Sequence, residues 1–262
     1  GDIDQLQVRE DMPIPRPGRE EVLIRVGASA VNNTDINTRV GWYSQSRSEA
    51  DAAWSGNPMK FPRIQGADCC GQITSVGSAI DPARIGERVL VRTMQEPVNV
   101  NGDLIPITLG SEIEGAFAEY LSVRASEAFV IDSPLDDAEL ASFPCSYSTA
   151  EGLLQRAQVG AERVLITGAS GGVGSAAVQL AAMRGASVVA GTTGAHVDDV
   201  RGIGAGESVD RAGDLVDQLG ESSIDVVIDL VGGPHFESLL RVLRPGGRYA
   251  TAGAVAGPHV AL

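Results

Sequence analysis

Three glycines spaced three residues apart, Gly168, Gly171 and Gly174, form the stretch of this sequence with the clearest chemical meaning. The apolar run 164–166 precedes them, and apolar residues at helical spacing follow them. A strand, a glycine turn and a helix in this order bring free backbone N–H groups and the positive end of a helix to one point. The segment therefore predicts a phosphate or pyrophosphate site, with a plain glycine-rich turn as the alternative.

Each glycine of the turn has a separate expected role. Gly168 permits the tight turn, Gly171 lets the backbone approach a pyrophosphate, and Gly174 lets helix and strand pack closely. The spacing G-x-x-G-x-x-G departs from the common G-x-G-x-x-G, so the prediction depends on the strand before the turn and the helix after it. The residues expected to contact a dinucleotide here are Gly168, Ser170, Gly171, Gly172, Val173 and Gly174.

Short apolar strands alternate with helices after residue 163. The predicted strands are 164–166, 186–192, 208–209, 224–230 and 248–252, and the predicted helices are 173–184, 197–203, 214–219 and 235–243. This alternation predicts an α/β fold with a doubly wound parallel sheet of the Rossmann type, and a nucleotide at the carboxyl ends of its strands. We expect the ribose and the nicotinamide to pass Val231 and Gly253, which follow two of these strands.

The end of the second strand indicates which nucleotide is bound. An NAD site usually places Asp or Glu about 20 residues after the first glycine, where it binds the ribose 2′-OH. Residues 189–194 contain no acid, which favours NADP(H). The candidates for the 2′-phosphate are Thr192, Thr193, His196 and Arg201. For Arg201 the alternative is a solvated helix residue.

Composition excludes several function classes. The 262 residues carry 20 Lys and Arg against 34 Asp and Glu, a net charge of −14, which argues against nucleic acid as a partner. The sequence has no run of 18 apolar residues, so we expect no transmembrane helix and no membrane partner. The three cysteines, Cys69, Cys70 and Cys145, form neither a disulfide framework nor a C-x-x-C pair, which favours buried thiols in a reducing cytoplasm.

The first half of the chain is β-rich. Strands are predicted at 21–26, 71–76, 88–91 and 117–123, a spacing that suggests a small barrel. Two long loops are predicted, at 44–62 and 97–114. The pattern becomes helical near Asp136. We therefore predict two domains, a β-rich domain over 1–130 and a dinucleotide-binding domain over 131–262.

Seven motifs in one order extend the interpretation to nearly the whole chain. They are VNNTDINTRVGWY (31–43), IQGADCCGQITSVG (64–77), IGERV (85–89), GAFAEYLSV (115–123), SFPCSYSTAEGLL (142–154), the glycine turn, and DVVIDLVGG (225–233). With them the chain resembles the medium-chain dehydrogenase/reductase superfamily. The resemblance implies a GroES-like barrel domain beside the Rossmann domain, and NAD(P)-dependent hydride transfer in a cleft between them. It also implies that the chain is truncated at both ends.

The same resemblance bears on zinc. Zinc alcohol dehydrogenases of this superfamily hold the catalytic metal with a cysteine, a histidine and a second cysteine. Asn32 and Ala67 stand at the first two of these positions, and only Cys145 remains at the third. Catalytic zinc needs three protein ligands and an open position. The chain therefore resembles the zinc-free branch, the quinone oxidoreductases and 2-enoyl thioester reductases, and we expect no metal.

The reaction that the resemblance implies is hydride transfer from NADPH to a quinone or to the C=C bond of an α,β-unsaturated carbonyl. Negative charge then builds on the acceptor oxygen and needs a donor. Tyr43 is the candidate donor because it aligns with a tyrosine of the enoyl reductases; the alternative is a loop tyrosine packed against Trp42 or Trp54. Asn32 is a candidate for positioning the nicotinamide or the substrate carbonyl, or else it caps a turn.

Ser146 and Thr149 lie near the nicotinamide by resemblance, although either could instead cap their helix. Two further functions stay open: a zinc-type alcohol dehydrogenase with atypical ligands, and a protein that binds NADPH without turnover. We expect a homodimer with a small-molecule acceptor. The fold alone does not choose among quinone, enone and enoyl thioester.

Overall fold

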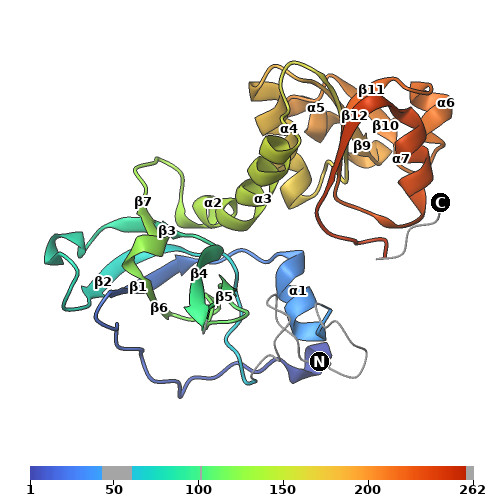
Figure 1. Ribbon diagram of the computed structural model, residues 1–262. Coiled ribbons are helices and arrows are strands. Elements are labelled where there is room, and N and C mark those ends of the chain that lie inside the picture. The colour runs from blue at the N-terminus through green and yellow to red at the C-terminus, as the bar shows by residue number, and fades with distance from the viewer. Residues whose placement is uncertain (43–60, 101, 258–262) are drawn as a thin grey trace. The chain divides into compact units, whose positions relative to one another are not determined.

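The computed structural model describes residues 1–42, 61–100 and 102–257 (Figure 1). The chain forms two compact units, Gly1–Cys145 and Ser146–Leu262, and each is described by itself. The domain boundary expected at residue 131 stays a prediction.

A five-stranded antiparallel sheet dominates the first unit. Its strands lie in the order β6-β1-β2-β3-β7. They are β1 (Glu21–Ala28), β2 (Cys70–Val76), β3 (Arg88–Val91), β6 (Tyr120–Arg124) and β7 (Ala128–Val130). Alternate residues such as Val22, Ile24 and Ile73 are buried in one core, because successive side chains of a strand point to opposite faces. The four strands predicted in this half are confirmed.

A β-hairpin lies where the sequence predicted a loop. Strands β4 (Met94–Val100) and β5 (Asp103–Thr108) pair antiparallel, so the loop prediction for 97–114 was wrong over most of its length. Pro97 lies at a register shift between Gln95 and Val98. A bulge tolerates proline because the missing N–H has no ladder bond to make there. The other predicted loop, 44–62, falls almost entirely outside the described residues.

Short helices complete the first unit. They are η1 (Ile3–Gln5), α1 (Asn33–Val40), η2 (Pro82–Arg84), η3 (Ala125–Glu127) and α2 (Asp137–Ala141). Helix α1 ends at Gly41, whose φ of 70° is a left-handed conformation that glycine adopts without a steric penalty.

A five-stranded parallel sheet forms the centre of the second unit. Its order is β10-β9-β8-β11-β12. The strands are β8 (Arg163–Thr167), β9 (Ser187–Thr192), β10 (Glu207–Asp210), β11 (Ile224–Asp229) and β12 (Leu243–Thr251). All five predicted strands are confirmed, although β12 begins five residues before the prediction. The direction of winding reverses between β8 and β11, and this reversal is the topological switch point at which such sheets bind ligands.

Helices cover both faces of this sheet (Figure 1). Val164 and Ile166 share a buried cluster with α3 (Phe143–Arg156), α4 (Gly172–Met183) and α5 (Val197–Gly202). Leu165 points the other way, into a cluster with α6 (Leu215–Leu219) and α7 (Phe236–Val242). Two short turns, η4 (Gly194–His196) and η5 (Gly233–His235), precede α5 and α7. The doubly wound α/β fold is therefore confirmed.

Candidate functional site

The glycine turn has the geometry that a dinucleotide site requires. Gly168 has a φ of +60°, and a Cβ at Gly174 would lie 2.1 Å from the carbonyl oxygen of Gly168. Only glycine fits this close approach of helix and strand. Gly171 is the N-cap of α4, and no described side chain caps that end of the helix. The first N–H groups of a helix have no acceptor within it, so this end can bind an anion.

Ser146 lies beside this turn. A Cβ at Gly172 would be 3.0 Å from Ser146 Oγ, and the Ser146 side chain is buried. Thr149 follows one turn later on the same helix, α3. The Gln179 amide of α4 donates to the Tyr147 hydroxyl of α3 at 2.9 Å, which ties the two helices together. The structure thus places Ser146 at the start of α4, and its proximity to the nicotinamide stays a prediction, as does that of Thr149.

A buried carboxylate connects the two strands at the switch point. Asp229 is the last residue of β11 and is fully buried. The hydroxyl of Thr167, the last residue of β8, donates to Asp229 Oδ1 at 2.6 Å. Thr167 in turn accepts the N–H of Leu230 at 2.9 Å. One carboxylate and one hydroxyl therefore fix the ends of both strands.

Asp229 also fixes the loop that follows β11. It accepts the N–H of Val231 at 3.0 Å and that of Gly232 at 3.2 Å. The Tyr249 hydroxyl of β12 donates to Asp229 Oδ2 at 2.5 Å. Burial, together with this hydrogen bond, raises the pKa of the Tyr249 phenol, so the phenol keeps its proton. Asp229 is not among the site residues predicted from the sequence, although an acid that ends an apolar strand before two glycines is a usable signal.

The loop held by Asp229 lies against the glycine turn. A Cβ at Gly168 would be 3.2 Å from Val231 Cγ2. A Cβ at Gly253 would be 3.6 Å from the Leu230 carbonyl oxygen, and Gly253 has a φ of +89°. The structure therefore brings together the glycine turn, Val231 and Gly253. In the sequence, each of these was recognised only because it follows a predicted strand.

The candidates for the 2′-phosphate do not all lie at the same place. Thr192 ends β9, and Thr193 follows it at the carboxyl edge. The Thr192 hydroxyl is buried and has no hydrogen-bond partner in the described part of the chain. His196 Nδ1 lies 3.0 Å from Asp199 Oδ2. Arg201 lies in the last turn of α5 and approaches Ser208 at 3.5 Å, so it lies nearer the opposite edge of the sheet.

Asn32 belongs to a polar cluster in the first unit. Its side-chain amide donates to Asp68 Oδ2 at 2.6 Å, and the Cys145 backbone N–H donates to Asp68 Oδ1 at 2.7 Å. Asp35 accepts the N–H of Asn32 at 2.8 Å and that of Ala67 at 3.0 Å. Burial raises the pKa of Asp68 to about 6 and that of the Cys145 thiol to about 12. The cluster therefore joins the positions that would hold zinc in a zinc alcohol dehydrogenase.

The residues of this cluster do not fit a zinc ion. An amide and an alanine occupy two of the three ligand positions, so the Cys145 thiol alone remains of the three protein ligands that catalytic zinc needs. Both Asp68 oxygens already accept hydrogen bonds. Among the described residues, no group of three or more His, Cys, Asp or Glu side chains is placed to hold a metal.

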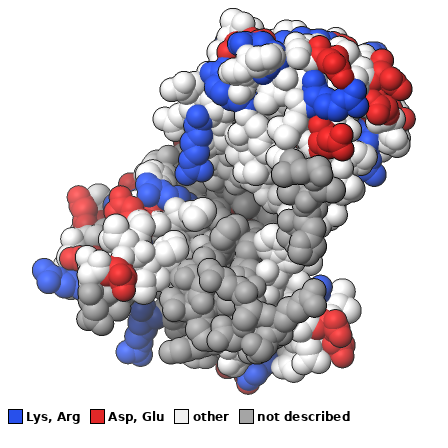
Figure 2. Space-filling view, turned by 45° about the vertical axis from the view of Figure 1, so that its right-hand side comes forward, with Lys and Arg blue, Asp and Glu red and all other residues white. Residues whose placement is uncertain are grey.

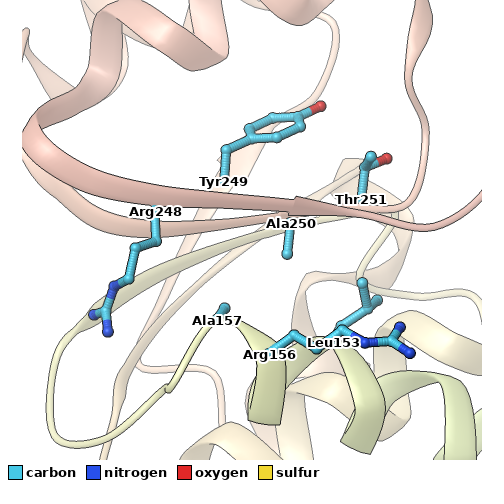
Figure 3. Close-up of a pocket in the computed structure, with 7 residues that line it drawn as sticks. All are labelled: Leu153, Arg156, Ala157, Arg248, Tyr249, Ala250 and Thr251. Atoms are coloured by element: carbon cyan, nitrogen blue, oxygen red, sulfur yellow. The ribbon is translucent and has the colours of Figure 1, made fainter.

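Tyr43, the candidate proton donor, lies outside the described residues, and its role stays a prediction. A hollow of about 430 Å³ lies between β12 and the end of α3 (Figure 3). The residues that line it are Leu153, Arg156, Ala157, Arg248, Tyr249, Ala250 and Thr251. It includes no residue of the glycine turn, so it is not the nucleotide site.

Acidic and basic side chains are interspersed over the face seen in Figure 2. Within the described ranges, no helix has both the length and the apolar character that crossing a membrane requires.

Comparisons with known proteins agree with this geometry. Residues 18–133 match the alcohol dehydrogenase GroES-like domain, and residues 172–261 match the family described as zinc-binding dehydrogenase. The chain is 30% identical over 263 residues to the quinone oxidoreductase of Homo sapiens, and the match covers 97% of this chain and 70% of that protein. The chain belongs to the medium-chain dehydrogenase/reductase superfamily, as the motifs predicted.

Two more relatives illustrate the range of that superfamily. The chain is 28% identical over 262 residues to the chloroplastic NADPH-dependent alkenal/one oxidoreductase of Arabidopsis thaliana; the match covers 98% of this chain and 62% of that protein. A solved structure assigned by name to the alcohol dehydrogenases, from Sinorhizobium meliloti 1021, is 44% identical with a TM-score of 0.91. That match covers 100% of this chain and 75% of the solved one.

Proposed function

We propose that this chain is an NADPH-dependent, zinc-independent oxidoreductase that transfers a hydride to a quinone or to an activated C=C bond. The observation that carries the proposal is the glycine turn at the switch point, where Gly168, Val231 and Gly253 converge. This arrangement suits the pyrophosphate of a dinucleotide, because the uncapped start of α4 offers it N–H groups at the switch point of the sheet.

Each part of the candidate site has a distinct role in this proposal. The N–H groups of residues 171–174 would bind the pyrophosphate, and Ser146 would border the start of α4. Val231 and Gly253 would border the ribose and the nicotinamide. Asp229 acts through the loop that it holds, so it is a positioning residue. When bound, NADPH supplies the hydride.

The proposed class of acceptor is supported by other observations than the glycine turn. Two relatives of this chain are a quinone oxidoreductase and an alkenal/one oxidoreductase. The Asn32–Asp68–Cys145 cluster does not fit the zinc that an alcohol dehydrogenase would use, because an amide and an alanine replace two of its ligands. We therefore favour reduction of a quinone or an α,β-unsaturated carbonyl, with Tyr43 as proton donor to the developing oxyanion. The homodimer and the cytoplasmic location stay predictions.

Turnover by chelator-treated protein tests the proposal. NADPH oxidation is followed with a simple quinone and, separately, with a simple enone, while the zinc content of the same sample is measured. We expect steady turnover with at least one acceptor, no stoichiometric zinc, and no loss of rate after chelation. The variant Gly174→Ala serves as the control, because a Cβ at that position would collide with the backbone of Gly168 and disrupt the turn.

Three outcomes would contradict the proposal in different ways. One zinc per chain with activity lost to the chelator would favour an alcohol dehydrogenase with atypical ligands. Tight NADPH binding without turnover on either acceptor class would favour a binding protein. A Tyr43→Phe variant that loses less than about threefold in kcat would remove only the proton-donor role, since general acids contribute about 10²–10⁴-fold.

A further inference from the structure

Arg211 follows β10 directly, at the carboxyl edge of the parallel sheet. In the register of β9 and β10, Asp210 is the partner of Thr192. The next residue, Arg211, donates its backbone N–H to the carbonyl oxygen of Thr192 at 3.0 Å. The end of β9 is the place at which a Rossmann fold recognises the adenosine ribose of its nucleotide. Arg211 therefore begins beside the ribose-binding edge, although it is 43 residues from Gly168 in the sequence.

The backbone around Arg211 is held in place by several hydrogen bonds. The Asp210 carboxylate accepts the N–H of Ala212 at 3.0 Å, and the Asp210 carbonyl accepts the N–H of Gly213 at 3.1 Å. The N–H of Asp210 donates to Gln218 Oε1 at 2.8 Å. The acid next to Arg211 in the sequence is thus engaged with a backbone amide of the turn.

The Arg211 side chain remains available. It is exposed, and within the described part of the chain it forms no ion pair or hydrogen bond. Many other arginines of the second unit are paired with acids: Arg163 with Glu207, Arg184 with Glu151, Arg241 with Glu221, Arg244 with Asp225, and Arg248 with Glu162. An exposed arginine without a protein partner, on a fixed backbone, suits a ligand that brings its own negative charge.

The other candidates at this edge are less suited to a phosphate. The Thr192 hydroxyl is buried beneath the surface. His196 already has Asp199 as a neighbour at 3.0 Å. Arg201 lies at the end of α5, and helices of a βαβ unit run antiparallel to the strands, so this residue is directed toward the amino edge.

We propose that Arg211 binds the 2′-phosphate of the adenosine ribose and sets the preference for NADPH over NADH. The inference rests on the proposed function, because it assumes that a dinucleotide occupies the glycine turn. A guanidinium forms two parallel hydrogen bonds with a phosphate, which a neutral ribose hydroxyl cannot match. Thr193, which is half-buried at the same edge, is a second possible donor to this phosphate.

Direct binding of NADPH and NADH to the full chain tests the inference without any need for turnover. Dissociation constants are measured by titration of nicotinamide fluorescence for wild type, Arg211→Gln and Arg201→Gln. Arg211→Gln should weaken NADPH by about 10- to 100-fold, the effect of losing a hydrogen bond to a charged group, and leave NADH unchanged. Arg201→Gln is the matched control and should change neither. Arg211→Lys should restore part of the NADPH affinity, since it restores the charge.

The outcomes separate the inference from the proposed function. A wild-type protein that binds both nucleotides equally, or binds neither, overturns the NADPH assignment itself. A wild-type preference for NADPH that survives in Arg211→Gln overturns the role of Arg211 alone. Equal weakening of NADPH and NADH by Arg211→Gln also overturns it, because the effect would then not depend on the 2′-phosphate. Both glutamine variants change exposed side chains, so unchanged melting temperatures confirm that they fold.

Discussion

The hydrogen bond between Tyr249 and Asp229 gives the sharpest prediction about the second unit. Tyr249→Phe removes one hydroxyl and leaves the ring, which packs edge-on against Phe236 with centroids 5.3 Å apart. Asp229 then keeps its bonds from Thr167, Val231 and Gly232. A hydrogen bond to a charged group contributes about 1.5–3 kcal/mol, so we expect Tyr249→Phe to lower the free energy of unfolding by about 2 kcal/mol.

Asp229→Asn should be more damaging. Every described neighbour of the carboxylate is a donor: two hydroxyls and two backbone N–H groups. The asparagine NH₂ group must face one of these donors, and the remaining bonds lose the charge that strengthens them. We expect a loss of about 3 kcal/mol or more. In the double variant the tyrosine substitution should add little, which gives a coupling energy of about 1.5 kcal/mol or more.

Urea unfolding of the full chain, followed by far-UV circular dichroism, measures these values. Tryptophan fluorescence is less suitable, because Trp42 and Trp54 both fall within residues 1–145. Tyr120→Phe is the matched control: Tyr120 is half-buried, and its hydroxyl has no hydrogen bond within the described residues. Its effect should stay within about 0.5 kcal/mol. If Tyr249→Phe changes stability no more than this control does, the network does not hold the loop and the reasoning is refuted.

Two further predictions concern the glycine turn and the buried acid of the first unit. Gly174→Ala should destabilise the chain by more than about 2 kcal/mol and weaken NADPH binding, because its Cβ would lie 2.1 Å from the Gly168 carbonyl oxygen. Gly152 lies in the interior of α3, where an added Cβ would meet no other atom, so Gly152→Ala should instead stabilise the chain by about 1 kcal/mol. Urea unfolding and NADPH titration measure both variants. Equal effects of the two substitutions would contradict the packing argument. The raised pKa of Asp68, about 6 against an ordinary 3.8, means that the folded state holds a proton that the unfolded state releases. The contribution of this proton to the free energy of unfolding is complete below pH 3.8 and is lost as the pH rises through about 6. The free energy of unfolding of wild type relative to Asp68→Asn should therefore fall by about 3 kcal/mol between these two pH values. A difference that does not vary with pH would show that the Asp68 carboxyl titrates normally.

The second unit could be predicted well because its local signals agree with its tertiary structure. Short β-branched runs became parallel strands, and polar residues marked the helix starts. Asp214, for example, accepts the N–H groups of Val216 and Asp217 at the start of α6. When propensity, periodicity and capping favour the same element, tertiary contacts have little to override.

The β4–β5 hairpin was missed because two local signals conflict. Pro97 argued against a strand, yet the bulge at this position removes the need for its N–H. The dipeptide Asn101-Gly102, which lies between Val100 and Asp103, is itself a typical hairpin signal and could have outweighed the proline. The sequence records the proline but not the register shift that accommodates it.

The candidate site was predictable only where it depends on one continuous segment. The glycine turn is such a segment, and Gly168 and Gly174 have the expected geometry. Asp229 and Arg211 are different, because their importance depends on which strands become neighbours. Thr192 and Arg211 meet through the pairing of β9 with β10, and Thr167 and Asp229 through that of β8 with β11. A single sequence does not reveal which strands pair with one another.

The way in which Asp229 holds the loop has a consequence for variation and redesign. The course of the backbone from Leu230 to Gly232 depends on one carboxylate, one hydroxyl and a glycine with a φ of +65°. It does not depend on hydrogen bonds from the side chains at 230 and 231. Val231 can therefore be exchanged for residues of similar size to alter the surface beside Gly168, where we propose that the nucleotide binds, while the loop keeps its path. Mutational libraries at this position should retain folded, nucleotide-binding members more often than libraries at Asp229.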